Sequence, residues 1–489
     1  MVMTASDIVA QCVEEQAQDF IELSDHIWDR PELRWQEFES IAAHREMAAR
    51  FGFRITDNVA GIPTAFMAES GSGGPVVAIL GEYDSLAGMS QQSGVARPEP
   101  DPFNESGNGQ GCGHHLLGSA SLLSAVAVAG FLHDQQLPGR VRYYGCPAEE
   151  AGAGKTFMVS GGAFADVAAA VSWHPSSITG VMFGNTLANC TAYFTFHGTP
   201  AHAAVAPHLG RSALDAAELM NIGVNFLREH MSGDCRIHYS FIDAGGPSPN
   251  VVQVAAQLFY IIRAQNVPDM RSLYERVVKV ARGAAMMTET ELEVVFDGGC
   301  SELLANVTLA QAMSDELGRL GPVPFDEGDR ARAEPFIQTI STSHLSAVRR
   351  TAGIRPDDQS PLHDGIRSFD ADAVLAPGRA STDVGDVSWV TPTVQCTIAT
   401  AALGTSVHSW QLVSQGKLPA AHKGMVHAAK VMAATAARIL GDPELLAEAR
   451  DEFAARVAMR PYDSPIPVGV LAPPVRQVDA GPAKLSGPL

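Results

Sequence analysis

The chain has 489 residues, of which 46% are hydrophobic and 18% charged, so we expect a folded protein of two or three domains rather than disorder. The formal net charge of -20 disfavours nucleic acid and anionic membrane surfaces as partners, although a local arginine can still bind an anionic substrate. The seven cysteines show no paired spacing, and the N-terminus lacks a basic region followed by an apolar run, so we predict reduced thiols and a cytoplasmic location.

The first part of the chain alternates between helical and strand patterns. Residues 5–52 have helical periodicity, and Pro31 divides them into two helices. The low-polarity run 115–132 predicts a buried helix, because it falls short of the roughly 20 apolar residues that span a bilayer. Short apolar runs predict buried strands at 75–81, 140–145 and 168–173. Polar residues follow these strands, at the sheet edge where α/β proteins form their sites.

A different pattern begins near residue 188. Two helices and four strands predict a compact α+β unit; the helices are 211–231 and 268–287, and the strands 190–197, 237–241, 251–263 and 291–296. After this unit come mixed elements, a terminal helical region at 425–457 and a Pro/Gly-rich tail at 461–489. We therefore expect an α/β fold with a catalytic domain at 1–187 and 306–489, a central mixed sheet flanked by helices, and an inserted domain at 188–305.

The most informative motif pairs Cys112-Gly-His114 with the acidic pair Glu149-Glu150. Two adjacent carboxylates at a strand end repel each other unless a cation neutralises one. A thiolate, an imidazole and a carboxylate form the donor mixture that zinc and similar ions accept. We expect Cys112, His114 and Glu150 to bind metal and Glu149 to act as general base beside it.

Two further histidines lie in unusual contexts, His174 in Trp-His-Pro and His408 in Val-His-Ser-Trp. With them the donor set can serve two divalent ions. The Cys112 thiolate would bridge the ions, with His114 and His174 on one and Glu150 and His408 on the other. Zinc, manganese and cobalt all accept such donors.

The inserted unit carries its own candidates. The segment His197-Gly-Thr-Pro-Ala-His202 predicts a rigid turn that presents His202, which could stabilise an oxyanion. Asn250 and Arg263 could orient a substrate, Arg263 by a bidentate grip on a carboxylate. The chain lacks a Gly-x-Ser-x-Gly elbow, and the segment around Lys155 lacks phosphate-loop spacing.

Taken together, the motifs resemble those of the M-20 family of dinuclear metallopeptidases and amidohydrolases, in the aminoacylase and hippurate-hydrolase branch. The resemblance covers nearly the whole chain. It rests on Glu-Tyr-Asp at 82–84, Cys-Gly-His-His at 112–115, Pro-Ala-Glu-Glu at 147–150, Trp-His-Pro at 173–175, His-Gly-Thr-Pro-Ala-His at 197–202, Ser-Thr-Asp-Val-Gly-Asp at 381–386 and His-Ser-Trp at 408–410.

This resemblance implies the same five ligands and Glu149 as base, with Glu82 and Asp84 orienting ligands from behind. It also implies that the insert is a ferredoxin-like lid that pairs two subunits into a homodimer, so that His202 could serve the partner's site. Two residues depart from the family pattern: Gln110 stands where histidine is common, and His115 where aspartate or asparagine is common.

The sequence thus predicts a metal-dependent amidohydrolase that cleaves N-acyl or N-aroyl amino acids, with p-aminobenzoyl-glutamate as the first substrate to test. Three alternatives stay open at this point. The same site could serve a dipeptidase or a hydrolytic aromatic deaminase. The chain could also be a non-catalytic subunit that pairs with a catalytic homologue.

Overall fold

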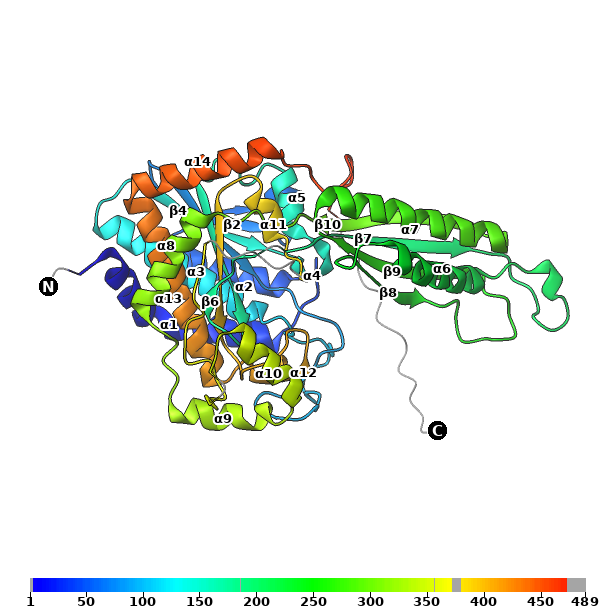
Figure 1. Ribbon diagram of the computed structural model, residues 1–489, viewed down its shortest axis with the longest axis horizontal. Helices are drawn as coiled ribbons and strands as arrows, with labels where there is room; N and C mark the ends of the chain where they lie inside the picture. The colour runs from blue at the N-terminus through cyan, green and yellow to red at the C-terminus, as the bar shows by residue number, and fades with distance from the viewer. Residues whose placement is uncertain (1–2, 185, 356, 372–379, 473–489) are drawn as a thin grey trace.

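The structure is a computed structural model that describes residues 3–184, 186–355, 357–371 and 380–472. A broad body carries the N-terminal and C-terminal parts of the chain, and a narrower part extends from one side of it (Figure 1). Each part has its own sheet and its own buried core.

A seven-stranded mixed sheet forms the centre of the body. Its strand order is β1 (Arg54–Asp57), β2 (Phe66–Ser72), β4 (Gly139–Cys146), β3 (Val76–Glu82), β5 (Ala169–Ser176), β11 (Thr393–Ala399) and β6 (Gly180–Val181). The four strands β4, β3, β5 and β11 run parallel, and the strands outside them are antiparallel to their neighbours. The predicted α/β class with a mixed sheet is therefore confirmed.

Helices cover both faces of this sheet because its inner strands are apolar on both sides. Val77 and Ile79 of β3 face the core shared with three mutually packed helices: α1 (Ala5–Asp29), α3 (His114–Asp134) and α13 (Pro419–Gly441). The alternate residues Ala78 and Leu80 face a second core, against α5 (Gly154–Ser160) and α11 (Val384–Ser388). The remaining helices of the body are α2 (Phe38–Arg50), α4 (Glu149–Gly152), α8 (Val307–Leu320), α9 (Glu327–Ile337), α10 (Thr342–Thr351), α12 (Trp410–Gln415) and α14 (Pro443–Met459).

Helix α3 is long and apolar enough to cross a membrane by length and composition alone. However, 89% of its apolar window is buried inside the protein. It therefore packs as the buried core helix that the sequence predicts.

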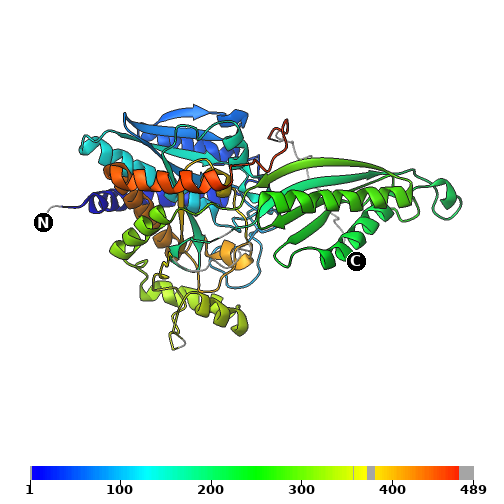
Figure 2. The same ribbon diagram turned by 45° about the horizontal axis from the view of Figure 1, so that its top comes forward.

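The extended part, which we call the lid, consists of β7 (Ala188–His197), α6 (Ala213–Leu227), β8 (Arg236–Asp243), β9 (Ala255–Ala264), α7 (Val267–Thr288) and β10 (Glu291–Cys300). Its strand order is β10-β7-β9-β8, with every pair antiparallel. A βαββαβ chain with this order is ferredoxin-like. Both helices pack on one face of the sheet, as Figure 2 shows. The alternating burial along β9 follows from that one-sided packing.

Several elements differ from the sequence expectation. Strand β9 begins at Ala255 rather than at residue 251, because the preceding residues form a turn around Gly245 and Gly246, both at positive φ. Strands β1, β2, β6 and β11 were not predicted. In the tail, residues 461–472 contain no helix or strand, and residues 473–489 lie outside the described residues.

Candidate active site

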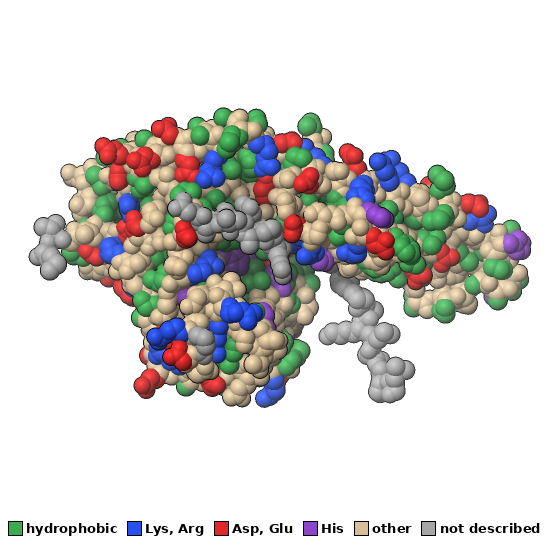
Figure 3. Space-filling view, viewed as in Figure 1, with side chains coloured by type: hydrophobic (Ala, Val, Ile, Leu, Met, Phe, Trp, Pro, Cys, Tyr) green, Lys and Arg blue, Asp and Glu red, His purple; other side chains and the backbone are tan. Residues whose placement is uncertain are grey.

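A cavity of about 610 Å³ lies where the lid meets the body. The body contributes residues from the carboxyl ends of its parallel strands, including His174 on β5 and Glu149 and Glu150 just after β4. The lid contributes residues from its sheet, among them Asn189 and Arg263. In Figure 3 histidine side chains are visible in the recess between the two parts. The site thus forms at the sheet edge expected for an open α/β fold.

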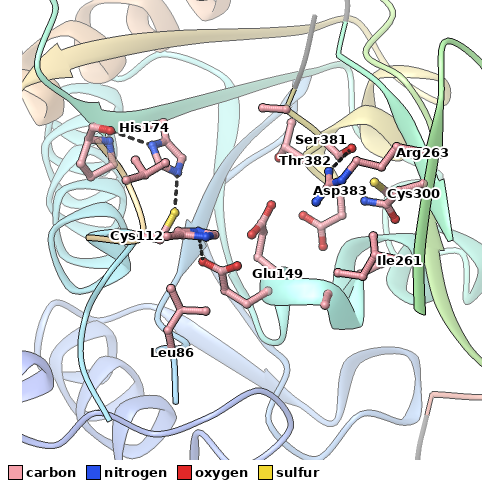
Figure 4. Close-up of a pocket in the computed structure, with 18 of the residues that line it drawn as sticks. Leu86, Cys112, Glu149, His174, Ile261, Arg263, Cys300, Ser381, Thr382 and Asp383 are labelled. Carbon is pink, nitrogen blue, oxygen red and sulfur yellow. Dashed lines mark hydrogen bonds and ion pairs between the residues drawn. The ribbon is translucent and has the colours of Figure 1, made fainter. Parts of the chain in front are cut away.

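Cys112 and His114 are brought together by the turn that starts α3. Gly113 between them has φ +79, a left-handed conformation that glycine adopts without strain. A side chain at this position would also contact Pro175 at 3.1 Å. Cys112 Sγ lies 3.3 Å from His174 Nε2, while His174 Nδ1 lies 2.8 Å from the Pro175 carbonyl oxygen (Figure 4). Both side chains are therefore directed toward the same point.

Asp84 orients two of the predicted ligands, as expected. Its Oδ1 lies 2.8 Å from His114 Nδ1, and its Oδ2 accepts a hydrogen bond from the Glu150 amide at 2.9 Å. Burial acts to raise the pKa of Asp84, but His114 and the Glu150 amide outweigh burial and lower it. The contact at Nδ1 leaves His114 Nε2 to face the site.

The loop that carries Glu149 and Glu150 is held in an unusual backbone conformation. Ala148, Ala151 and Ala153 all have positive φ, between 56° and 62°. Each such residue costs about 1–2 kcal/mol outside glycine, and strain of this kind collects at functional sites. The loop points Glu150 Oε1 to within 2.9 Å of His408 Nε2, and His408 itself has φ +58.

The predicted ligands form two groups that share one residue. Potential ligand atoms of Cys112, His114 and His174 lie within 4.8 Å of one another, and so do those of Cys112, Glu150 and His408. Donors at about 2.0–2.3 Å from a tetrahedral ion are roughly 3.3–3.8 Å apart, so both groups fit such an ion. His114 Nε2 and Glu150 Oε1 are buried and make no hydrogen bond to the described residues, which also fits donors that face a cation.

Glu149 lines the cavity between the Cys112 side and the Arg263 side (Figure 4). Burial raises the pKa of Glu149 well above its ordinary value, and the neighbouring carboxylates Glu82, Glu150 and Asp383 raise it further. A carboxyl group with a raised pKa and access to the cavity is suited to exchange protons with a substrate.

A buried lysine, which the sequence reasoning did not select, lies behind Glu149. Lys155 Nζ bonds to Glu82 Oε1 at 2.5 Å and to Asp383 Oδ1 at 2.7 Å, and its side chain is fully buried. The signal was present as a single cation within the small and apolar residues 151–159. A buried charge of this kind needs paired partners, and here both are carboxylates of the candidate site.

The lid gives the cavity a cationic wall despite the acidic chain. Arg263 lines the cavity and donates a hydrogen bond to Ser381 Oγ at 2.5 Å. His238, which was not predicted, lines the same wall, and its pKa is lowered first by burial and then by Arg263. The wall is placed to receive an anionic group of a substrate.

His202 and Asn250 are not brought to this cavity within one chain. Strand β7 runs from Asn189 at the cavity to His197, a length of about 27 Å, and His202 follows in the loop beyond. His202 is exposed, and its Nδ1 accepts hydrogen bonds from the amides of Ala204 and Val205. Asn250 lies beside it and accepts a hydrogen bond from the Ala203 amide.

The two residues that depart from the family pattern turn away from the ligand groups. His115 is fully buried, its Nε2 lies 3.1 Å from the Gly416 carbonyl oxygen, and burial lowers its pKa to about 3. The Gln110 side chain accepts from the His115 amide at 3.3 Å and donates to the Tyr83 carbonyl at 3.4 Å. Both side chains therefore brace the start of α3 from behind.

Arg34, another residue that was not predicted, ties the lid to the glutamate loop. Its guanidinium donates to the Ala151 carbonyl at 2.9 Å, to Asp297 of β10 at 2.7 Å and to the Tyr193 hydroxyl of β7 at 3.1 Å. The same group lies 5.2 Å from the ring centroid of Phe259. The strained loop and the lid are thus fixed to each other by one side chain.

Replacing Arg34 with methionine should lower the free energy of unfolding by on the order of 3 kcal/mol, because Asp297 would keep a buried charge without its main partner. The double variant Arg34→Met/Asp297→Leu should recover part of this loss. Arg45→Met, which breaks a half-exposed pair with Asp57, serves as control and should cost less than about 1 kcal/mol. Urea denaturation measures all three, and equal losses in Arg34→Met and Arg45→Met would contradict the assignment.

Comparison with solved structures shows which class of protein has this fold. An aminobenzoyl-glutamate utilization protein from Klebsiella pneumoniae superimposes with a TM-score of 0.58 at 17% identity, over 88% of this chain and 97% of that chain. A dinuclear metal-binding peptidase of the M20 family from Bacillus subtilis gives 0.51 at 19% identity, over 88% and 99%. The fold is that of the M20 peptidases.

Comparison with curated sequences shows the family directly. One of the two subunits of the p-aminobenzoyl-glutamate hydrolase of Escherichia coli is 45% identical over 96% of this chain and 98% of its own length. The mouse Xaa-Arg dipeptidase is 26% identical over 92% of each chain, and the other E. coli hydrolase subunit is 28% identical over 48% of this chain. No family model matches the chain. The chain belongs to the M20 family of hydrolases and is close to p-aminobenzoyl-glutamate hydrolase.

Proposed function

We propose that this protein is a dinuclear metal amidohydrolase that cleaves the amide bond of N-acyl or N-aroyl amino acids. The observation that carries the proposal is the pair of ligand groups that share Cys112, next to Glu149 in one cavity. Cys112, His114 and His174 would hold one divalent ion, and Cys112, Glu150 and His408 the other. Zinc and manganese suit these donors best, and cobalt is a further candidate.

The residues of the chain divide the chemistry among themselves. Two divalent ions, when bound, would polarise the substrate carbonyl and acidify a water molecule. Glu149 accepts the proton of that water and passes it to the nitrogen of the leaving amine, which requires the proton affinity that its raised pKa indicates. Arg263 holds a substrate carboxylate, and Asp84 fixes the orientation of His114.

The cationic wall favours anionic substrates over cationic ones. Arg263 and His238 would attract the carboxylates of an aroyl-glutamate and repel the side chain of a dipeptide that ends in arginine. We therefore propose p-aminobenzoyl-glutamate as the substrate to test first, with Xaa-Arg dipeptides as the second candidate class because of the dipeptidase relative.

A direct assay tests the proposal. The purified chain is loaded with zinc, manganese or cobalt, and kcat/KM is measured for p-aminobenzoyl-glutamate, N-acyl amino acids and Xaa-Arg dipeptides. We expect the aroyl-glutamate to have the highest kcat/KM and chelation to abolish its cleavage. Faster cleavage of Xaa-Arg substrates would favour the dipeptidase, and ammonia release without a free amino acid would indicate a deaminase.

We also propose that two copies pair through the lid. Strand β8 is an edge strand with exposed Phe241 and Ile242, and the adjacent helix α6 exposes Ile222 and Phe226. An exposed apolar edge of this kind is a template for pairing with another strand. A homodimer would let the far end of each lid, with His202 and Asn250, approach the partner's cavity. The seven cysteines are all free, which supports a cytoplasmic location.

Mixing two inactive variants tests the trans role of His202. His202→Ala and Glu149→Gln, each inactive alone, should together give about a quarter of wild-type activity, because half of random dimers are mixed and each of these has one intact site. Co-expression with different tags and a hydrolysis assay measure this. Activity no higher than that of either parent would contradict the trans role. Activity that requires an added homologue of the other hydrolase subunit would indicate a hetero-assembly instead.

A further inference from the structure

Glu82 occupies a position that its expected supporting role does not explain. The residue ends β3 and is 1% exposed. Its Oε1 is held by Lys155, whereas its Oε2 lies 3.2 Å from His114 Nε2 and makes no hydrogen bond with a described residue. A residue that orients a ligand from behind would contact His114 Nδ1. Asp84 already does so, and Glu82 contacts the opposite nitrogen, which faces the site.

The contact between Glu82 and His114 is close without being a hydrogen bond. His114 Nε2, like Glu82 Oε2, is buried and makes no hydrogen bond to the part of the chain that is described. With the Nδ1 proton directed at Asp84, the neutral ring presents a lone pair at Nε2, which repels a carboxylate oxygen. A cation placed between the two atoms turns this repulsion into attraction, as for any pair of metal donors.

Glu82 also belongs to a third group of potential ligands. Ligand atoms of Glu82, His114 and Glu149 lie within 4.8 Å of one another, the same spacing as in the two groups that contain Cys112. Two carboxylates this close are costly in a buried place unless positive charge lies near them. Lys155 supplies charge to Glu82 from the opposite side and fixes the direction of the carboxylate.

We infer that Glu82 coordinates directly the ion that Cys112, His114 and His174 hold, as its fourth protein donor. This inference rests on the proposed two-ion site. The donor is monodentate, because Lys155 occupies the other oxygen. The ion would then have a thiolate, two imidazoles and a carboxylate oxygen, a donor set that zinc and manganese both accept.

Substitution of Glu82 with two controls tests this assignment by metal binding alone. Glu82→Gln keeps the shape and an oxygen for Lys155 but removes the anionic donor, whereas Asp84→Asn weakens only the support of His114 from behind. In Co²⁺ titrations of the metal-free protein, Asp84→Asn should lower the affinity of one site by about 10–100-fold without changing the visible bands. Glu82→Gln should lower it by more than about 100-fold and shift the ligand-field bands of that site. Glu82→Asp, which keeps the charge paired with Lys155 but shortens the reach, should shift the bands in the same way.

The outcomes separate this inference from the proposal on which it rests. Two bound ions in the wild type with wild-type affinity and bands in both Glu82 variants would overturn the role of Glu82 and leave the two-ion site intact. A wild-type protein that binds no Co²⁺ at the Cys112 site would overturn both. Should Glu82→Gln fail to fold, the bands of Glu82→Asp decide.

Discussion

Replacing Glu149 with glutamine is expected to lower kcat for amide hydrolysis by about 10²–10⁴-fold while both ions stay bound. Glutamine has almost the same shape as glutamate, so the loop and the ligand Glu150 should keep their places. What is lost is the group that accepts the proton of the attacking water and returns it to the leaving amine. Steady-state kinetics together with metal analysis of the same preparation measure the two effects.

Glu149→Asp is the matched control for this variant. It keeps a carboxylate but withdraws it by one methylene, so it should retain more activity than Glu149→Gln. The assignment of the base is wrong if Glu149→Gln keeps full activity with two ions bound. A loss of ions in Glu149→Gln would instead show that Glu149 is a metal ligand, a role that its presence in the group with Glu82 and His114 makes worth measuring.

The fold could be predicted where the sequence pattern is strongly periodic or strongly apolar. The apolar run that forms β3 and the low-polarity run that forms α3 are buried on every side, so their composition alone reports their place. Strand β1 has only four residues and is mostly exposed, so it lacks such a signal. Strand β11 pairs with β5, more than two hundred residues earlier in the chain, and no local pattern shows that pairing.

The candidate site divides in the same way. Its predicted ligands sit in short motifs at the ends of strands, where residue type and spacing suggest the chemistry. Arg34 and His238 carry no such motif, because their roles come from the way the lid packs against the body. The direct contact of Glu82 with His114 Nε2 also depends on side-chain direction, which the Glu-Tyr-Asp motif does not specify.

Cys112→Ser is expected to remove both ions and with them all measurable hydrolysis. Cys112 is common to the two ligand groups, and a serine hydroxyl is not anionic near neutral pH and cannot replace a bridging thiolate. His408 belongs to one group only and is half-exposed, so His408→Ala should keep one ion. Metal content measured after gel filtration should therefore fall from two ions per chain to one in His408→Ala and to less than one in Cys112→Ser.

Stability gives an independent measure of the same bridge. Ions that bind only the folded chain raise the free energy of unfolding by about 4 kcal/mol at a free concentration of 1,000 Kd, for each independent site. Added metal should therefore stabilise the wild type strongly, His408→Ala by roughly half as much, and Cys112→Ser hardly at all. If Cys112→Ser is stabilised as much as His408→Ala, the thiolate serves one ion, and the two ligand groups must be joined by another donor.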